Sequence, residues 1–294
     1  MNRLTSLALA AAAVVTLAGA APARAQQPAA PDSSGYVAAN GVNYWFEIHG
    51  KGEPLLLLHG GLLSTGMFGP TLTKLAETHR VIGVDLHGHG RTGLGTRPKI
   101  DLVDIGRDLA VVVEKLGVRK VDVMGYSFGA GAAMQLAFQR PELVRRLVVV
   151  SAPYAQDGFF AEMLPQQAAV SGAMADGMKD NPMYKSYASI APKPQDFPRL
   201  LDAMGALMRQ PYDWSASVKQ LSMPVMLVFG DADMIRPEHI VSFYHLLGGG
   251  ERDPGWTREH MSKNRLAILP NVTHYEMGTA PSLPATVLPF IDAR

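Results

Sequence analysis

Apolar residues follow two alternating patterns along the chain, short continuous runs and longer segments with helical spacing. Runs that are apolar at nearly every position predict strands buried on both faces. They occur at 54–58, 81–84, 121–124, 147–150, 225–229 and 266–269. Helical spacing is clearest at 103–116, 130–138 and 239–247. This alternation predicts an α/β fold with a mainly parallel central sheet flanked by helices.

The amino-terminal part of the pattern has a period of two. Residues 42–48 alternate in the manner of a strand with one buried face, and they directly follow Asn40-Gly41. An Asn-Gly pair tolerates the positive φ angles of a tight two-residue turn. The sequence therefore predicts a β-hairpin at the start of the domain.

One long segment, residues 156–215, contains no convincing strand and has helical pieces interrupted by prolines. It is rich in methionine, with Met163, Met174, Met178, Met183, Met204 and Met208. An insertion at the carboxyl ends of parallel strands is where a lid over a pocket would lie, and ordinary helical packing is the alternative. We predict a helical cap over 156–215, between the core stretches 36–155 and 216–294.

The first 25 residues differ from the rest of the chain. A basic residue precedes an Ala/Leu/Val-rich run over 4–20, and Ala23-Arg24-Ala25 has the form of an A-x-A cleavage site. These features are typical of a secretory signal peptide, because the apolar run is too short for a comfortable membrane span. We predict cleavage after Ala25, a disordered leader over 26–35, and a periplasmic or secreted protein without stable membrane association.

Charge and cysteine content exclude several classes of function. The chain has 27 Lys and Arg against 26 Asp and Glu, so it lacks the basic field that binds nucleic acid. It has no cysteine, which excludes disulfides, thiolate metal sites and a cysteine nucleophile. His87 and His89 have a spacing that suits zinc, but no third ligand is near them in the sequence, so we predict no metal site.

The strongest chemical signal is Gly125-Tyr126-Ser127-Phe128-Gly129, which lies between a predicted strand and a predicted helix. Small residues around a serine allow a strained strand-to-helix turn, the nucleophile elbow, that exposes Oγ at the top of the sheet. The alternative is a serine in a glycine-rich turn without a chemical role. The context favours Ser127 as a nucleophile.

A serine becomes nucleophilic when a base removes its proton and a carboxylate orients that base. Of the nine histidines, His274 is the best candidate because it follows the last predicted strand. Two acids, Asp231 and Asp233, compete in the loop after the strand at 225–229. We expect Asp231 to cap the turn and Asp233, further along the loop, to face the top of the sheet.

Donors for a developing oxyanion are expected in the turn His59-Gly60-Gly61, which follows a predicted strand. A glycine-rich turn lets backbone N–H groups approach the nucleophile closely. We predict the N–H groups of Gly61 and Phe128 as the oxyanion donors, with Leu62 as an alternative to Gly61. The side chain of His59 is expected to hold the loop through hydrogen bonds.

Taken in order, these segments resemble the α/β-hydrolase superfamily, and the resemblance extends from about Tyr36 to Arg294. Similar chains carry an H-G-x turn, a D-x-x-G-H-G-x-[ST] segment, a G-x-S-x-G elbow and a G-x-x-D-x-x-x-P acid loop. The matching residues are His59–Gly61, Asp85–Thr92, Gly125–Gly129, and Gly230 with Asp233 and Pro237. The resemblance favours Asp233 as the acid and implies a structural role for Asp85–Thr92. A serine at the elbow disfavours the dehalogenase and epoxide hydrolase branches, which need aspartate there.

The expected reaction is acyl transfer to water without a metal or organic cofactor. Ser127 would attack the carbonyl of a small-molecule ester or lactone, His274 would move the proton and Asp233 would orient His274. A C–C bond hydrolase or a cofactor-free haloperoxidase-like enzyme would use the same residues. A ligand-binding protein built on a hydrolase scaffold is an alternative from another class.

The apolar, methionine-rich cap predicts a small to medium hydrophobic acyl or alcohol group in the substrate. We expect three aromatic residues to contribute to the pocket, namely Phe68, Phe159 and Phe160.

Overall fold

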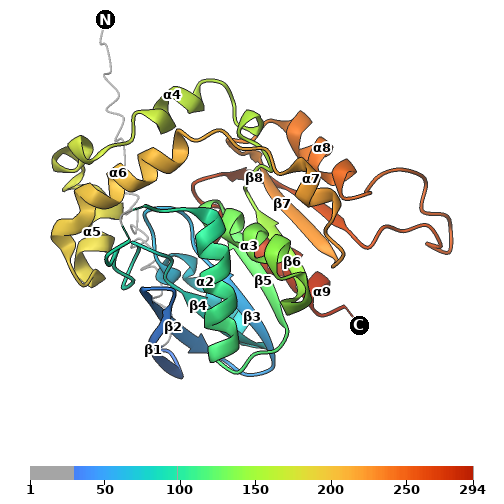
Figure 1. The fold of residues 1–294 in the computed structure, drawn as a ribbon. Helices are drawn as coiled ribbons and strands as arrows, with labels where there is room; N and C mark the ends of the chain where they lie inside the picture. The colour runs from blue at the N-terminus through green and yellow to red at the C-terminus, as the bar shows by residue number, and fades with distance from the viewer. Residues whose placement is uncertain (1–29, 98, 294) are drawn as a thin grey trace, which may run out of the picture.

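The computed structural model of the protein describes residues 30–97 and 99–293. Within them, eight strands form one sheet in the order β1-β2-β4-β3-β5-β6-β7-β8 (Figure 1). The pairs β1–β2 and β2–β4 are antiparallel, and every pair from β4 to β8 is parallel. The strands are β1 (Ser33–Ala39), β2 (Val42–His49), β3 (Glu53–Leu58), β4 (His79–Val84), β5 (Val121–Tyr126), β6 (Val144–Val150), β7 (Val225–Ala232) and β8 (Arg265–Thr273). The mainly parallel α/β fold predicted from the sequence is confirmed.

The predicted hairpin is formed by β1 and β2, and its turn holds Asn40 at φ 46° and Gly41 at φ 87°. Strand β1 begins at Ser33, which pairs with Ile48, so residues 33–35 belong to the sheet and not to the predicted leader. An edge strand is held by backbone hydrogen bonds, which small polar residues make without any apolar pattern. The predicted signal peptide, residues 1–25, lies outside the described residues.

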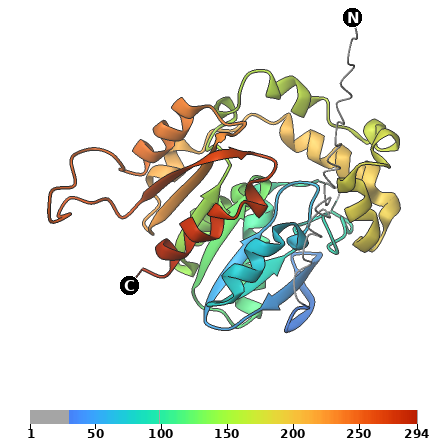
Figure 2. The ribbon, with the colours of Figure 1, turned by 180° about the vertical axis from the view of Figure 1, so that it is seen from behind.

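Helices cover both faces of the sheet, and the leucines of β3 show how the two layers form. Leu56 and Leu58 are buried in one cluster with residues of α2, α3 and α8, and Figure 1 shows α2 and α3 in front of the sheet. Leu55 and Leu57 are buried in a second cluster with residues of α1 and α9, the face seen in Figure 2. These helices are α1 (Pro70–Ala76), α2 (Leu102–Lys115), α3 (Phe128–Gln139), α8 (Pro237–Leu246) and α9 (Ser282–Ile291). Among the described residues, no helix has the length and apolar character needed to cross a membrane.

The segment between β6 and β7 contains helices and short 3-10 turns and no named strand. Its helices are α4 (Met163–Ala168), α5 (Pro182–Ile190), α6 (Phe197–Met208) and α7 (Ser215–Lys219). Helices α4, α5 and α6 extend across one end of the sheet in both views (Figures 1 and 2). An isolated bridge pairs Ala155 with Asp213, so the chain enters and leaves this segment at neighbouring positions. A second bridge pairs Phe159, near the start of the segment, with Ile235 in the loop after β7.

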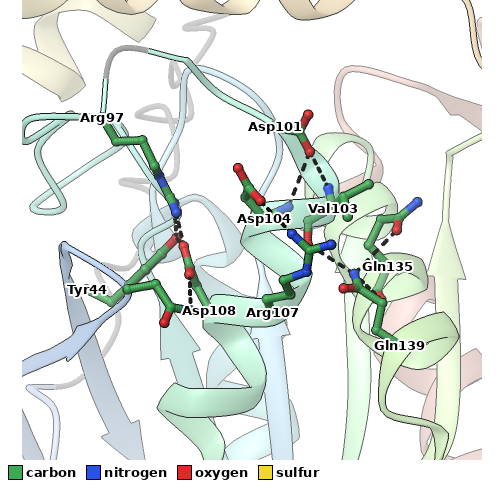
Figure 3. Close-up of polar contacts among 10 residues, drawn as sticks. Tyr44, Arg97, Asp101, Val103, Asp104, Arg107, Asp108, Gln135 and Gln139 are labelled. Atoms are coloured by element: carbon green, nitrogen blue, oxygen red, sulfur yellow. Dashed lines mark hydrogen bonds and ion pairs between the residues drawn. The ribbon is translucent and has the colours of Figure 1, made fainter.

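A polar cluster joins α2 to the first hairpin (Figure 3). Asp101 caps α2 and accepts hydrogen bonds from the N–H groups of its first turn. Asp108, fully buried on α2, accepts hydrogen bonds from the Tyr44 hydroxyl at 2.7 Å and from the Asn40 amide at 2.8 Å. The Arg97 guanidinium forms an ion pair with the same carboxylate. The cluster thus connects the β1–β2 hairpin, the loop that contains Arg97, and α2.

A long loop, residues 248–264, joins α8 to β8 and projects from the body of the molecule in both views (Figures 1 and 2). Trp256 in this loop is fully exposed. Trp256 therefore contributes nothing to the packing of the core, whereas Asn264 at the end of the loop is buried and accepts a hydrogen bond from the Val225 N–H at 2.8 Å.

Candidate active site

Ser127 lies at the sharp turn between β5 and α3, at φ 53° and ψ −116°. This backbone conformation is strained for a residue with a side chain. The flanking glycines are required by close packing. A Cβ on Gly125 would lie 2.3 Å from the carbonyl oxygen of Gly129, and one on Gly129 would lie 2.4 Å from the carbonyl oxygen of Leu58. The segment therefore has the geometry of a nucleophile elbow.

The structure brings the three predicted site residues together. The Ser127 hydroxyl lies 3.1 Å from His274 Nε2, and His274 Nδ1 lies 2.9 Å from Asp233 Oδ1. Both His274 and Asp233 are buried. Asp231 points elsewhere, because it is exposed and accepts a hydrogen bond from the Val272 N–H at 3.3 Å. Asp233, and not Asp231, therefore contacts the histidine.

The carboxyl group of Asp233 stays ionised although it is buried. Burial opposes ionisation, but the hydrogen bond and charge of His274 act against it, as do hydrogen bonds from the Ser151 hydroxyl and the Gly230 N–H. These contacts outweigh burial and hold the pKa of Asp233 below its ordinary value. An ionised Asp233 accepts a hydrogen bond from the Nδ1–H of His274, which leaves Nε2 free to take the proton of Ser127.

Backbone N–H groups next to Ser127 are free to bind a negatively charged oxygen. Within the described residues, the N–H groups of Gly61, Leu62 and Phe128 make no hydrogen bond. A Cβ on Gly61 would lie 3.7 Å from that of Phe128, which places the two predicted donor segments in contact. Leu62 has a φ of 60°, and all three residues line the same cavity as Ser127. The turn after β3 thus brings unpaired donors to the elbow, with Leu62 still an alternative to Gly61.

The family of the chain follows from its sequence. The profile of the family described as alpha/beta hydrolase fold matches residues 53–252. The chain belongs to this family. It is 26% identical over 249 residues to the pimeloyl-[acyl-carrier protein] methyl ester esterase of Nitrosomonas europaea, which covers 78% of this chain and 91% of that protein.

Other relatives of this alpha/beta hydrolase match over shorter stretches. RutD of Azorhizobium caulinodans, named for a proposed carbamate hydrolase activity, is 36% identical over 124 residues, which are 42% of this chain and 46% of that protein. The chain thus matches less than half the length of this relative. The solved structure of E-2-(acetamidomethylene)succinate hydrolase has a TM-score of 0.69 at 20% identity and covers 89% of this chain and 99% of that one. That similarity shows the fold.

His59 and Asp85 hold the loops around the site of this alpha/beta hydrolase. His59 Nε2 accepts a hydrogen bond from the Leu86 N–H at 2.9 Å, and His59 Nδ1 donates to the Gly60 carbonyl at 2.8 Å. Burial lowers the pKa of His59, so its ring is neutral. The Asp85 carboxylate accepts hydrogen bonds from the N–H groups of Thr65 at 2.9 Å and Arg91 at 2.8 Å. These contacts give both residues the structural role expected from the sequence.

The paired histidines of the Asp85–Thr92 segment bind backbone groups. His87 Nε2 lies 3.0 Å from the Leu94 carbonyl oxygen, and His89 Nδ1 lies 2.8 Å from the carbonyl oxygen of His87. The ring of His89 stacks on Phe128, with 5.1 Å between the ring centroids. Over residues 30–97 and 99–293, no group of three or more His, Cys, Asp or Glu side chains is placed to hold a metal ion.

Two residues that contact the site are missing from the sequence-based prediction. The Tyr126 hydroxyl donates a hydrogen bond to the carbonyl oxygen of His274 at 2.5 Å, and the Ser151 hydroxyl donates to Asp233 Oδ2 at 2.5 Å. Ser151 directly follows β6, as Ser127 follows β5. A polar residue at the carboxyl end of a buried strand was the signal that could have found it, because such ends meet at one edge of a parallel sheet.

A cavity of about 880 Å³ lies between the Ser127 edge of the sheet and the segment 156–215. Its lining is mainly apolar, and the methionines that reach it are Met163, Met183, Met204, Met208 and Met234. Phe159 lines the cavity as predicted, whereas Phe160 does not. Phe68 is also absent from the lining, because it is buried in the core cluster formed with α1 and α9. Among the described residues, no lysine or arginine lines the cavity.

Proposed function

We propose that the protein is a serine hydrolase that cleaves carboxylic ester or lactone bonds in neutral, mainly apolar substrates of small to medium size. The observation that carries this proposal is the hydrogen-bonded line from Ser127 through His274 to the ionised Asp233, beside unpaired N–H groups, in one apolar cavity. A nucleophile, a base, an orienting acid and oxyanion donors are the parts that acyl transfer needs.

The proposed reaction has two steps with a covalent intermediate. Ser127 Oγ attacks the carbonyl carbon while His274 Nε2 takes its proton, and the N–H groups of Gly61 and Phe128 stabilise the negative oxygen. His274 then gives the proton to the leaving alcohol, and an acyl group remains on Ser127. Water, activated by His274, releases the acid and restores the serine.

The cavity lining supports a neutral substrate. In the part of the chain that the structure describes, the only acid in the lining is Asp101, which caps α2, and the polar side chains include the carboxamides of Gln156, Gln167 and Gln210. A buried substrate carboxylate would find no cationic partner there, which makes its transfer from water costly. The named activity of the Nitrosomonas europaea relative, a methyl ester esterase, agrees with ester cleavage as the reaction class.

We also propose that the enzyme is exported, on the basis of the signal-like sequence over residues 1–25. Amino-terminal sequencing of the protein from a periplasmic fraction or culture medium is expected to begin at Gln26. A cytoplasmic protein that keeps residues 1–25 would contradict this part of the proposal.

The hydrolase proposal is tested with Ser127→Ala. We expect hydrolysis of p-nitrophenyl butyrate to fall by on the order of 10⁶ in kcat, and labelling by a fluorophosphonate probe to be lost. Ser189→Ala is a matched control, because Ser189 is exposed on α5 and its hydroxyl bonds only the Ser186 carbonyl. Undiminished ester hydrolysis by the Ser127 variant would refute the mechanism.

A panel of substrates separates the remaining alternatives. Esters of graded length, acyl-homoserine lactones and a C–C bond substrate are compared by kcat/KM with the wild-type enzyme. A clear preference for the C–C substrate would replace the ester hydrolase proposal. A folded protein with an inert Ser127 would indicate a binding protein on a hydrolase scaffold.

A further inference from the structure

Two adjacent parallel strands end in the same unusual way. Ser127 follows β5 and Ser151 follows β6, and both serines have a φ of 53°. The Ser127 N–H donates a hydrogen bond to the Val150 carbonyl at 2.8 Å, and the Ser151 N–H donates to the Val228 carbonyl at 2.9 Å. A left-handed φ is costly for a residue with a Cβ and is adopted freely by glycine. A serine at position 151 therefore suggests that its hydroxyl is needed.

Within the described residues, the Ser151 hydroxyl has a single partner, the carboxylate of Asp233. Ser151 is fully buried, and its Oγ lies 2.5 Å from Asp233 Oδ2. The other carboxylate oxygen, Oδ1, accepts hydrogen bonds from His274 Nδ1 at 2.9 Å and from the Met234 N–H at 2.8 Å. A weaker contact to Oδ2 comes from the Gly230 N–H at 3.4 Å. Ser151 is thus the strongest donor on the side of the carboxylate opposite His274.

We propose that Ser151 is a positioning residue that fixes the Asp233 carboxylate so that Oδ1 faces His274. The inference rests on the proposed hydrolase function. Without the Ser151 hydroxyl, only the weaker contact from the Gly230 N–H holds Oδ2, so the carboxylate can rotate about its last side-chain bond and no longer holds the imidazole in line with Ser127. Ser151 lies in the cavity wall but acts through Asp233, and no step of the reaction takes place on it.

Ser151 also sets how strongly Asp233 attracts the proton of His274. The hydrogen bond from Ser151 draws negative charge toward Oδ2, so its loss leaves more negative charge on Oδ1, beside the imidazole. The protonated form of His274 is then stabilised more strongly, and the acid limb of the kcat/KM profile moves to higher pH. The other titratable groups near this pair are Tyr126 on β5, Asp231 on β7, and Tyr275 and Glu276 after β8. None of them changes in the variants below.

The test compares Ser151→Ala with Ser151→Gly, which both remove the hydroxyl. We expect kcat on p-nitrophenyl butyrate to fall by about 10- to 100-fold in both, the range set by a hydrogen bond to a charged group. KM is expected to stay within about twofold of wild type, and the acid limb to move to higher pH. Glycine fits φ 53° without strain, so Ser151→Gly is expected to melt at a higher temperature than Ser151→Ala.

Asn271→Gly is the matched control, because Asn271 is an exposed residue of β8 with a φ of 58° and lies near His274 in the sequence. This variant relieves the same kind of strain and is expected to keep wild-type kcat and pH profile. Ser151→Gly with wild-type kcat and profile would overturn the inference. A lower kcat with an unmoved acid limb would also overturn it, because that result indicates a general packing defect. Active Ser127→Ala would instead reject the hydrolase proposal itself.

Discussion

His239 shows how a single buried side chain makes the stability of this protein depend on pH. Its ring stacks on Tyr154, with 4.0 Å between the ring centroids, and its Nε2 accepts a hydrogen bond from the Tyr154 N–H at 3.2 Å. Burial lowers the pKa of His239 to about 4, although the nearby charge of Asp157 acts in the opposite direction. Burial likewise lowers the pKa of His89 to about 3. Both rings are therefore neutral in the folded protein at neutral pH.

The free energy of unfolding should fall as the pH is lowered from about 6.5 to about 4. In this window the unfolded chain binds a proton at position 239 and the folded chain does not, so protons favour unfolding. Between these two pH values, the fall in the free energy of unfolding is expected to be about 2 to 3 kcal/mol smaller in His239→Gln than in the wild type. Urea unfolding at the two ends of the window measures it. His260→Gln, a change of an exposed histidine, should keep the wild-type dependence of the free energy of unfolding on pH. The same dependence in His239→Gln would contradict the prediction.

The residues of the candidate site differ in how far the sequence could predict them. Ser127 and His274 were selected from short motifs next to predicted strands, whereas the choice of Asp233 over Asp231 rested also on the resemblance to the hydrolase family. Ser151 and Tyr126 act through contacts with residues 82 and 148 positions away in the chain, and no local pattern encodes such a contact. Long-range partners of this kind need the register of the sheet, which the sequence alone does not reveal.

At the level of elements, helix α2 carries two ion pairs, one buried and one exposed (Figure 3). Asp108 is buried and binds Arg97, whereas Asp104, one turn earlier, forms an exposed pair with Arg107 at 3.0 Å. Removal of one partner from a buried pair leaves an uncompensated charge, but an exposed pair is screened by water. The two aspartates on one helix thus offer a controlled comparison.

Asp108→Asn is expected to lower the free energy of unfolding by about 2 to 3 kcal/mol and the melting temperature by about 5 to 10 °C. Asp104→Asn should change the free energy of unfolding by less than about 1 kcal/mol. Thermal unfolding followed by circular dichroism measures both variants. Equal effects would show that the buried cluster does not hold the hairpin and the loop to α2.

The sequence predicted elements best where their pattern was regular. All six apolar runs are strands, and the three segments with helical spacing overlap α2, α3 and α8. Helices α1 and α9 were not predicted, since α1 is short and α9 contains Pro289, which interrupts a helical pattern. Strand β8 extends to Thr273, beyond its apolar run and through Pro270, so His274 follows a strand directly. Backbone pairing with β7 carries the strand past the point where apolar residues end.

At the level of the whole molecule, the cavity should set the preference for chain length. Each buried methylene contributes about 0.8 kcal/mol, so kcat/KM for p-nitrophenyl esters is expected to rise by about two- to fourfold per methylene until the cavity of about 880 Å³ is full. A matched ester whose acyl chain ends in a carboxylate should be at least about tenfold slower, because no lysine or arginine of residues 30–97 and 99–293 lines the cavity. A preference for the charged ester would contradict a neutral substrate.

The connection between the helical segment 156–215 and the core also has a consequence for the evolution of such an enzyme. Its two ends meet at the bridge Ala155–Asp213, so the chain leaves and re-enters the core at neighbouring positions. A recombination event that replaced the whole segment would leave the strand ends that carry Ser127, Asp233 and His274 in place. Substrate range can therefore diverge by exchange of one continuous stretch of gene, while the chemistry is inherited unchanged.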